Sequence, residues 1–328
     1  GYIIPSTGDG DEAEYYWNPG SAQRYSEKQF CLPDAIYDPF QYEAIYYGSK
    51  QKLTTIPKTA FSYDKYQLFS NKVIDPLNNQ TTVDIFDYQI FQPIKITDIN
   101  GNDSSALYDA LGFVIVTSFS GTQIDGEFGF IDLADYKTIT PTNIEDVFSS
   151  PDKYLQGAAS YFHYNAHAWI NEQQPVHAIQ LVQPNYTFIN QKNVTSVETP
   201  MQSVAYSDGF GRQLQSKEFI DAEQKVKEYD VTTKQVTQSQ IDGVWLTSGA
   251  VRYDRKGQPI KQFEPFFSAT CDYTCEQRLN KVGFASTLFY DAMGEAVLTL
   301  TAEGFIDKTL HGDLQGPDDV SPILPGWL

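Results

Sequence analysis

The chain has 328 residues, of which 41% are hydrophobic and 14% aromatic, so it can bury a substantial core as one large all-β body or as two units. Its formal net charge of −19 argues against the clustered Lys and Arg of a nucleic-acid-binding surface and disfavours anionic membranes. Its longest apolar stretch, residues 111–116, is far shorter than the roughly 20 residues of a transmembrane helix. We therefore expect a globular chain with no nucleic-acid partner and no membrane span.

Residues 1–121 form an expected first β block, which opens with an acidic run at residues 8–14 (GDGDEAE). A calcium-binding EF-hand loop starting at Asp9 would need Gly at its sixth position, where this sequence has Glu14. A solvated acidic segment is therefore the better interpretation. Residue 1 is Gly and no signal-peptide pattern follows it, so we expect a mature product or a fragment.

A recurring Tyr-Asp turn phrase organises the chain. It is clearest at residues 108–113 (YDALGF) and 290–295 (YDAMGE), with looser copies at 37–40, 206–212 and 253–258 and abbreviated turns at 75–79 and 98–102. Gly or Asn at the fourth or fifth place permits positive φ, Asp accepts hydrogen bonds from turn N–H groups, and the Tyr ring can stack over its neighbour. Runs rich in β-branched residues follow most copies, so each phrase predicts a β-hairpin.

Successive hairpins must pair side by side, because a single hairpin is marginally stable in water. The sequence therefore predicts an all-β fold in which irregular hairpin repeats form a curved β-sheet strip. The residues expected to set the turns are Asp98, Gly101, Tyr108, Asp109, Gly112, Asp208, Gly211, Arg212, Tyr253, Asp254, Gly257, Tyr290, Asp291 and Gly294.

The hairpin pattern is interrupted in residues 122–174, which we interpret as a helical insertion. Ser150 suits an N-cap and Pro151 the first helical turn, and Leu155, Phe162 and Trp169 are among the apolar residues that recur at helical spacing. One amphipathic helix is predicted near residues 151–170. A second β block is expected over 175–315, with a polar hairpin or loop at 223–239, and a Pro-rich tail over 316–328.

Metal-ligating residue types are present without a convincing ligand set. His163 and His167 are four residues apart and His177 follows, but the metalloprotease pattern needs a Glu between the first two. Cys271 and Cys275 lack two-residue spacing and a second ligand pair, and Cys31 leaves an odd number of thiols. We therefore expect ordinary histidines and thiols, and no bound metal.

Catalytic signatures are equally scarce. The sequence contains no Gly-x-Ser-x-Gly, no phosphate-binding Gly-rich loop and no dinucleotide fingerprint. Carboxylates are abundant, but no pair stands out as a glycosidase acid and nucleophile. The sequence therefore predicts a protein without enzyme activity and without a cofactor.

The residues resemble the Rhs/YD-repeat proteins, in particular the middle to C-terminal region of the B component of insecticidal toxin complexes. The matching segments run in order along nearly the whole chain: residues 17–20 (WNPG), 30–33 (FCLP), 38–40 (DPF), 91–102 (FQPIKITDINGN), 108–112 (YDALG), 152–158 (DKYLQGA), 174–178 (QPVHA), 206–217 (YSDGFGRQLQSK) and 261–267 (KQFEPFF). Each is weak alone, and their order makes the resemblance specific. The family's Arg after the turn Gly is kept at Arg212 but replaced by Phe113 and Glu295.

The resemblance implies a secreted or extracellular structural protein associated with virulence. Family members of this type form a spiralling β-sheet strip that closes, with a partner, into a hollow shell around an unfolded toxic cargo. This chain would then be a non-catalytic section of the shell wall, with flanking or partner Rhs-repeat segments and the encapsulated toxin as its partners. The alternative is a free-standing secreted β module that binds glycans or a cell surface through exposed Tyr and Trp.

Overall fold

The computed structural model describes residues 21–37, 58–123, 126–189, 192–193 and 198–309. These residues form mainly antiparallel β-sheet with short helices, which confirms the predicted all-β fold of hairpin repeats. The chain divides into two compact units. Unit 1 is residues 1–137, 156–160 and 185–198, and unit 2 is residues 138–155, 161–184 and 199–328. The division into blocks at residues 121, 174 and 315 stays a prediction.

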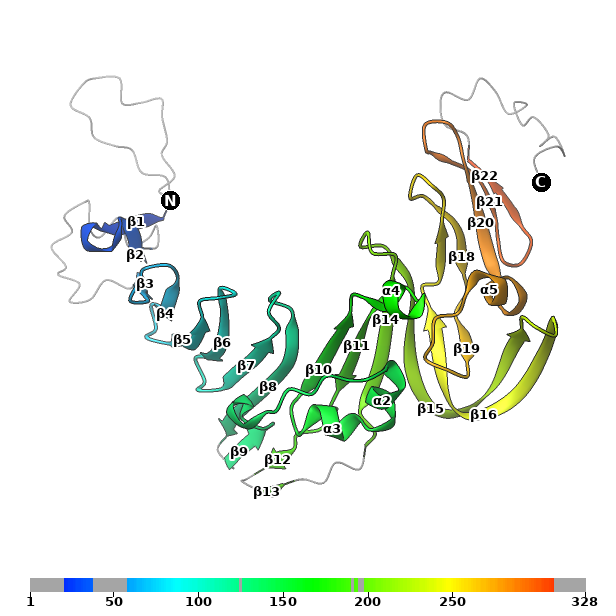
Figure 1. Cartoon of the computed structure of the whole chain (residues 1–328). Helices are drawn as coiled ribbons and strands as arrows, with labels where there is room; N and C mark the ends of the chain where they lie inside the picture. Colours follow the sequence, from blue (N-terminus) through cyan, green and yellow to red (C-terminus); the bar gives the residue numbers. More distant parts are fainter. Residues whose placement is uncertain (1–20, 38–57, 124–125, 190–191, 194–197, 310–328) are drawn as a thin grey trace, which may run out of the picture. The chain divides into compact units, whose positions relative to one another are not determined.

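Unit 1 is a β-meander in which each strand pairs antiparallel with the next one in the sequence. Figure 1 shows its hairpins following one another along the chain. The strands are β1 (Ala22–Ser26), β2 (Leu32–Tyr37), β3 (Lys58–Tyr63), β4 (Ser70–Ile74), β5 (Gln80–Asp87), β6 (Gln92–Thr97), β7 (Asp103–Tyr108), β8 (Val114–Gln123) and β9 (Gly126–Gly129). The 3-10 helices η1 (Glu27–Gln29) and η2 (Leu133–Asp135) and the short strands β12 (Phe188–Ile189) and β13 (Lys192–Asn193) complete it.

Strands β3 to β7 form a single sheet layer in which no side chain is fully buried. Contacts between aromatic rings partly replace a core there: the rings of Phe69 and Phe86 stack with centroids 3.7 Å apart, and Phe86 also meets Phe91 edge to face. Fully buried apolar side chains of unit 1 lie outside these five strands, for example at Val116, Leu133 and Ala158.

Unit 2 contains an antiparallel sheet in the order β11-β14-β15-β16-β19 and a five-stranded sheet in the order β17-β18-β20-β21-β22. The first is built from β11 (Val176–Val182), β14 (Met201–Ser207), β15 (Gln213–Asp230), β16 (Gln235–Ser248) and β19 (Phe266–Ser268). The second is built from β17 (Val251–Tyr253), β18 (Pro259–Phe263), β20 (Ala285–Tyr290), β21 (Ala296–Leu300) and β22 (Ile306–Lys308). Four short helices occur among the described residues: α2 (Ile144–Ser149), α3 (Pro151–Leu155), α4 (Ala168–Glu172) and α5 (Glu276–Val282).

The core of unit 2 follows from strict alternation along its strands. Every second residue of β11 is buried, including Ile179 and Leu181, and β14 buries Val204 and Tyr206 in the same way. Helix α2 adds Phe148, whose ring lies 4.7 Å from that of Trp245 in β16. The polar segment at 223–239 forms the far part of the β15–β16 hairpin, the longest in Figure 1, so the hairpin alternative for this segment is correct.

The single amphipathic helix predicted near residues 151–170 is not what the structure shows. Helix α3 starts at Pro151 as expected but ends at Leu155, because Gln156 and Gly157 have φ of +49° and +89° and turn the chain out of the helix. Strand β10 (Ser160–Asn165) follows and buries Tyr161, and α4 is a separate helix. The apolar spacing of this segment also fits a short strand between two helices, and positive φ at a Gln gives little signal in a sequence.

Candidate functional site

The Asp turns are the recurring local structure of the chain, and the turn at Asp109 shows their geometry. The Asp109 N–H donates to Phe113 O at 2.9 Å, and the Gly112 N–H donates to Asp109 O at 3.0 Å. The Asp109 Oδ1 accepts from the N–H groups of Leu111 and Phe113, both at 2.9 Å. Gly112 has φ of +84°, a left-handed conformation that disfavours residues with a Cβ. The carboxylate therefore satisfies two turn N–H groups, and Gly closes the hairpin.

The structure places the other predicted turn residues in the same geometry. The aspartate carboxylate accepts from the N–H groups two and four residues later in the turns that begin at Asp75, Asp98, Asp208, Asp254 and Asp291. The residue three positions after the aspartate has positive φ in each: Asn78, Gly101, Gly211, Gly257 and Gly294. The looser copy at residues 37–40 lies largely outside the described residues.

Hydrogen bonds to the carboxylate favour its charged form. Those from the side chains of Asn79 and Asn102 are the main cause that lowers the pKa of Asp75 and of Asp98. At Asp208 the bonds from the Phe210 and Arg212 N–H groups and the Arg212 guanidinium outweigh burial, so its pKa is also lowered. These turns are therefore formed with ionised aspartates.

Two further turns of this kind have no Tyr-Asp-x-x-Gly signature. Asp64 accepts from the N–H groups of Tyr66, Leu68 and Phe69 in a turn one residue longer, where Gln67 takes φ of +59° in place of Gly. Thr301 uses its hydroxyl to accept from the Phe305 N–H at 3.1 Å, with Gly304 at φ of +90°. A pattern of Asp or Thr before any turn residue would find them, at the cost of many false matches.

The Tyr of the phrase has a role that the sequence did not reveal. The Tyr108 hydroxyl donates to Pro93 O at 3.0 Å, on the neighbouring strand β6. The same bond recurs from Tyr63 to Pro33 O, from Tyr253 to Gln213 O and from Tyr290 to Pro259 O. For Tyr108, Tyr63 and Tyr290 the acceptor lies at the start of the preceding hairpin's second strand. For Tyr253 it begins β15, the second strand of the hairpin closed by the Asp208 turn. The Tyr therefore ties its hairpin to an earlier one.

Arg212 contacts both its own turn and a residue of the next predicted turn. Its Nε donates to Asp208 Oδ2 at 2.5 Å, within the same turn. Its guanidinium lies 4.9 Å from the ring centroid of Tyr253, which belongs to the next predicted turn. The stacking expected of the Tyr therefore occurs here against an arginine.

A buried cation in unit 2 was not identified from the sequence. Lys217 is 1% exposed, and its Nζ donates to Ser268 Oγ, Thr270 O and Thr274 Oγ1, each at 3.0 Å. These three acceptors are neutral oxygens, and burial lowers the pKa of Lys217 from 10.5 to about 8. The Tyr206 hydroxyl donates to Cys271 O at 2.9 Å. Side chains of β14 and β15 therefore anchor the loop between β19 and α5.

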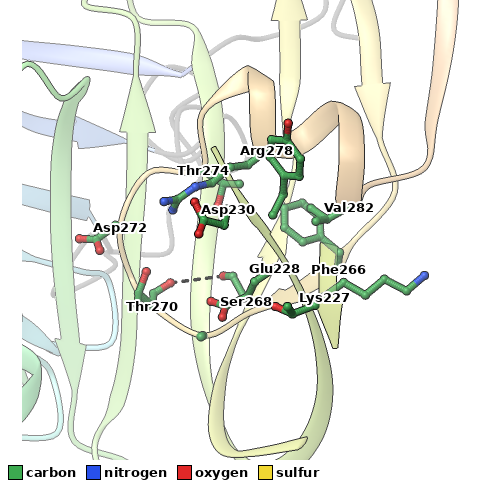
Figure 2. Close-up of a pocket in the computed structure, with 13 residues that line it drawn as sticks. Lys227, Glu228, Asp230, Phe266, Ser268, Thr270, Asp272, Thr274, Arg278 and Val282 are labelled. Atoms are coloured by element: carbon green, nitrogen blue, oxygen red, sulfur yellow. Dashed lines mark hydrogen bonds between the residues drawn. The ribbon is translucent and has the colours of Figure 1, made fainter. Parts of the chain in front are cut away.

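The cavity in Figure 2 lies on this loop and has a volume of about 230 Å³. Ser268, Thr270 and Thr274 line it, and their oxygens already accept from Lys217. The Lys227 side chain points away from it in Figure 2, toward a place over the Phe284 ring. Two hydroxyl oxygens of its wall, Ser268 Oγ and Thr274 Oγ1, are thus engaged by Lys217.

The histidines and cysteines are dispersed among the described residues. His163 lies in β10 and His167 precedes α4, so their helical spacing is lost, and burial lowers the pKa of His163. The His177 Nδ1 lies 3.1 Å from Pro175 O. Cys31, Cys271 and Cys275 are free, and burial raises the pKa of the Cys271 thiol to about 12. No group of three His, Cys, Asp or Glu in the described part of the chain could hold a metal ion.

The architecture and its turns define an Rhs-type fold. Comparison with solved structures shows which known proteins share this fold. The chain resembles the crystal structure of TcdB2-TccC3 with a TM-score of 0.73 and 20% identity, over 94% of this chain and 14% of that one. It resembles TcdB2-TccC3 without its hypervariable C-terminal region at 0.70 and 19%. It resembles a Tc holotoxin pore from Photorhabdus luminescens at 0.69 and 19%. The chain therefore has the fold of the toxin-complex B component.

The likeness covers almost all of this chain but only a small part of the known structures. The chain spans about 15% of their length, being 14% of one and 16% of the others quoted. No protein-family model matches the sequence, and no curated protein matches it. No helix among the described residues has the length and apolarity needed to cross a membrane.

Proposed function

We propose that this chain is a non-catalytic wall section of a toxin-encapsulating Rhs-type shell, as in the B component of toxin complexes. The observation that carries the proposal is the single-layer sheet of β3 to β7, in which no side chain is fully buried. Such a layer has two faces and little core, which suits a wall between an enclosed space and the solvent. The fold likeness to TcdB2-TccC3 supports the same assignment.

The partners follow from this role. Flanking or partner Rhs-repeat segments would pair with the ends of the strip, because a strand at the edge of a sheet leaves unpaired N–H and C=O groups. The enclosed partner would be a toxin, as the structures named for a toxin pore suggest. A toxin shell acts outside the producing cell, so the chain would be secreted or extracellular.

The test is the particle that the whole gene product forms. The full-length protein that carries this chain is expressed and viewed by negative-stain electron microscopy, before and after limited proteolysis. We expect a closed, hollow, protease-resistant particle. The 328-residue chain expressed alone should self-associate through its strip ends.

A matched variant links the particle to the turns. Gly112→Val in the full-length protein should open the wall and expose protease sites. Gly112→Asn should not, because Asn78 holds the equivalent position with φ of +67°. A stable monomer with no hollow particle from the full-length protein would contradict the proposal and favour the free-standing glycan-binding module.

A further inference from the structure

Unit 2 contains a second cavity, with a volume of about 550 Å³. It lies where α4 and the start of β11 meet the Asp208 turn and the loop that leads to α5. Its volume falls within the range of about 300–1,000 Å³ that is typical of ligand-binding pockets.

The apolar part of the wall consists of Trp169, Pro175, Val176, Leu214 and Tyr273. Trp169 is 61% exposed although Ala168 beside it is fully buried, so α4 is anchored by one residue and presents the next to solvent. The Tyr273 ring lies 5.5 Å from that of Tyr206, whose hydroxyl is bonded to Cys271 O. The buried Ala168 therefore fixes the helix that carries Trp169, and packing against Tyr206 fixes Tyr273.

The polar part of the wall includes two amides and the Asp208 carboxylate, which is paired with Arg212. Gln173 sits at φ of +56°, and its Nε2 donates to Trp169 O at 3.0 Å, which fixes the amide beside the indole. Gln174 adds a second amide. The Asp208 carboxylate is occupied by turn N–H groups and by Arg212. The lining contains no Lys, Arg or His, so it does not favour an anionic ligand.

We propose that this cavity binds a neutral saccharide, with one pyranose ring stacked on Trp169. A pyranose ring has an apolar C–H face that packs on an aromatic ring, and a rim of hydroxyl groups that both donate and accept hydrogen bonds. Side-chain amides provide both roles, and a wall whose one carboxylate is already paired with Arg212 suits an uncharged ring. A proline-rich peptide could pack on the same aromatic wall. Proline has no N–H group, however, so such a peptide would offer the two amides only carbonyl acceptors and no donors.

The test uses the 328-residue chain on a printed array of neutral glycans, followed by titration of the best glycan with isothermal titration calorimetry as readout. Trp169→Ala removes the stacking surface and should weaken binding about tenfold or more, as expected for a truncated aromatic anchor. Ile170→Ala is the matched control, because Ile170 is 73% exposed on the same helix and does not line the cavity. It should bind as the wild type does.

The outcomes separate the ligand classes. Because Trp169 is largely exposed, its replacement should leave the thermal midpoint unchanged, and near-UV circular dichroism checks that the fold is kept. Absence of binding to every neutral glycan, equal binding by Trp169→Ala, or binding to a decaproline peptide in place of sugars would each overturn the proposal. Sugar binding does not depend on particle formation, so this test can fail or succeed independently of the shell assay.

Discussion

The meander of unit 1 and the β11-β14-β15-β16-β19 sheet of unit 2 use the same Asp turns but are stabilised differently. In β3 to β7 no side chain is fully buried, whereas β11 and β14 bury alternate residues and β15 buries Gln215 and Lys217 completely. The meander must therefore depend on its turns, on the Tyr bonds between hairpins and on ring contacts. Unit 2 has a packed interior, and its turns add to a structure that burial already favours.

The difference suggests a division of roles within a strip fold. A sheet layer without a core can be lengthened or shortened by whole hairpins, because each hairpin brings its own turn bonds, and Tyr63 and Tyr108 tie their hairpins to the preceding ones. A packed unit cannot be changed in this way, since removing one strand would expose the interior of its neighbours. Single substitutions in each region test this difference in stabilisation.

The largest expected effect concerns Lys217 in unit 2. Its pKa is about 8 in the folded chain against 10.5 for the ordinary side chain, so folding disfavours the charged form. The penalty is complete below pH 8 and disappears as the pH rises toward 10.5, so stability should increase across this window by on the order of 2–3 kcal/mol. Chemical denaturation of the wild type at pH 7.5 and 10 measures it, with Lys217→Met as reference.

The control is Lys225→Met, eight residues along the same strand and exposed. It should keep the rise of stability with pH, while Lys217→Met should abolish it. A wild-type pH dependence equal to that of Lys217→Met would show that the ammonium is not desolvated as the structure indicates.

The second prediction concerns a turn of unit 1. Gly112→Val places a β-branched residue at φ of +84° and should destabilise the meander by about 1–3 kcal/mol. The cost comes from the backbone, since a Cβ at Gly112 would meet no atom within 4 Å. Gly112→Asn should cost far less, because Asn tolerates this conformation and Asn78 already adopts it. Equal thermal midpoints for both variants and the wild type would refute the dependence of unit 1 on turn conformation.

The third prediction removes the carboxylate of the same turn. Asp109→Ala leaves the N–H groups of Leu111 and Phe113 without their acceptor and should cost about 1–2 kcal/mol. Asp109→Asn keeps an oxygen at the same place and should lose only part of this. Urea denaturation monitored by aromatic fluorescence measures both. If Asp109→Asn proves as unstable as Asp109→Ala, the oxygen is not the stabilising feature.

The sequence predicted the turns better than the helices or the buried polar residues. Asp and Gly at fixed spacing are typical of one local structure, a turn in which the carboxylate accepts from N–H groups and Gly takes a positive φ. The turns at Asp98, Asp109 and Asp291 could therefore be predicted. Residues 151–170 were misjudged because their apolar spacing fits both a helix and a strand with helices on either side. Lys217 was missed because a lysine in an alternating strand is normally on the solvent face, and only the tertiary structure brings Ser268, Thr270 and Thr274 onto it.

The smallest expected effect is that of a single tyrosine hydroxyl. Tyr108→Phe removes the hydrogen bond to Pro93 O and keeps the ring, so it should cost about 1 kcal/mol. Tyr108→Leu also removes the ring and should cost more. Because this bond joins β7 to β6, the loss should appear as faster hydrogen exchange of the amides in these two strands, while β11 and β14 stay protected. Tyr290→Phe should act in the same way on β20 and β18, where the Tyr290 hydroxyl donates to Pro259 O at 2.7 Å. If Tyr108→Phe left exchange in β6 and β7 unchanged, the tyrosine would be held by its ring alone, and the meander would owe its cohesion to ring packing as unit 2 owes its cohesion to its core.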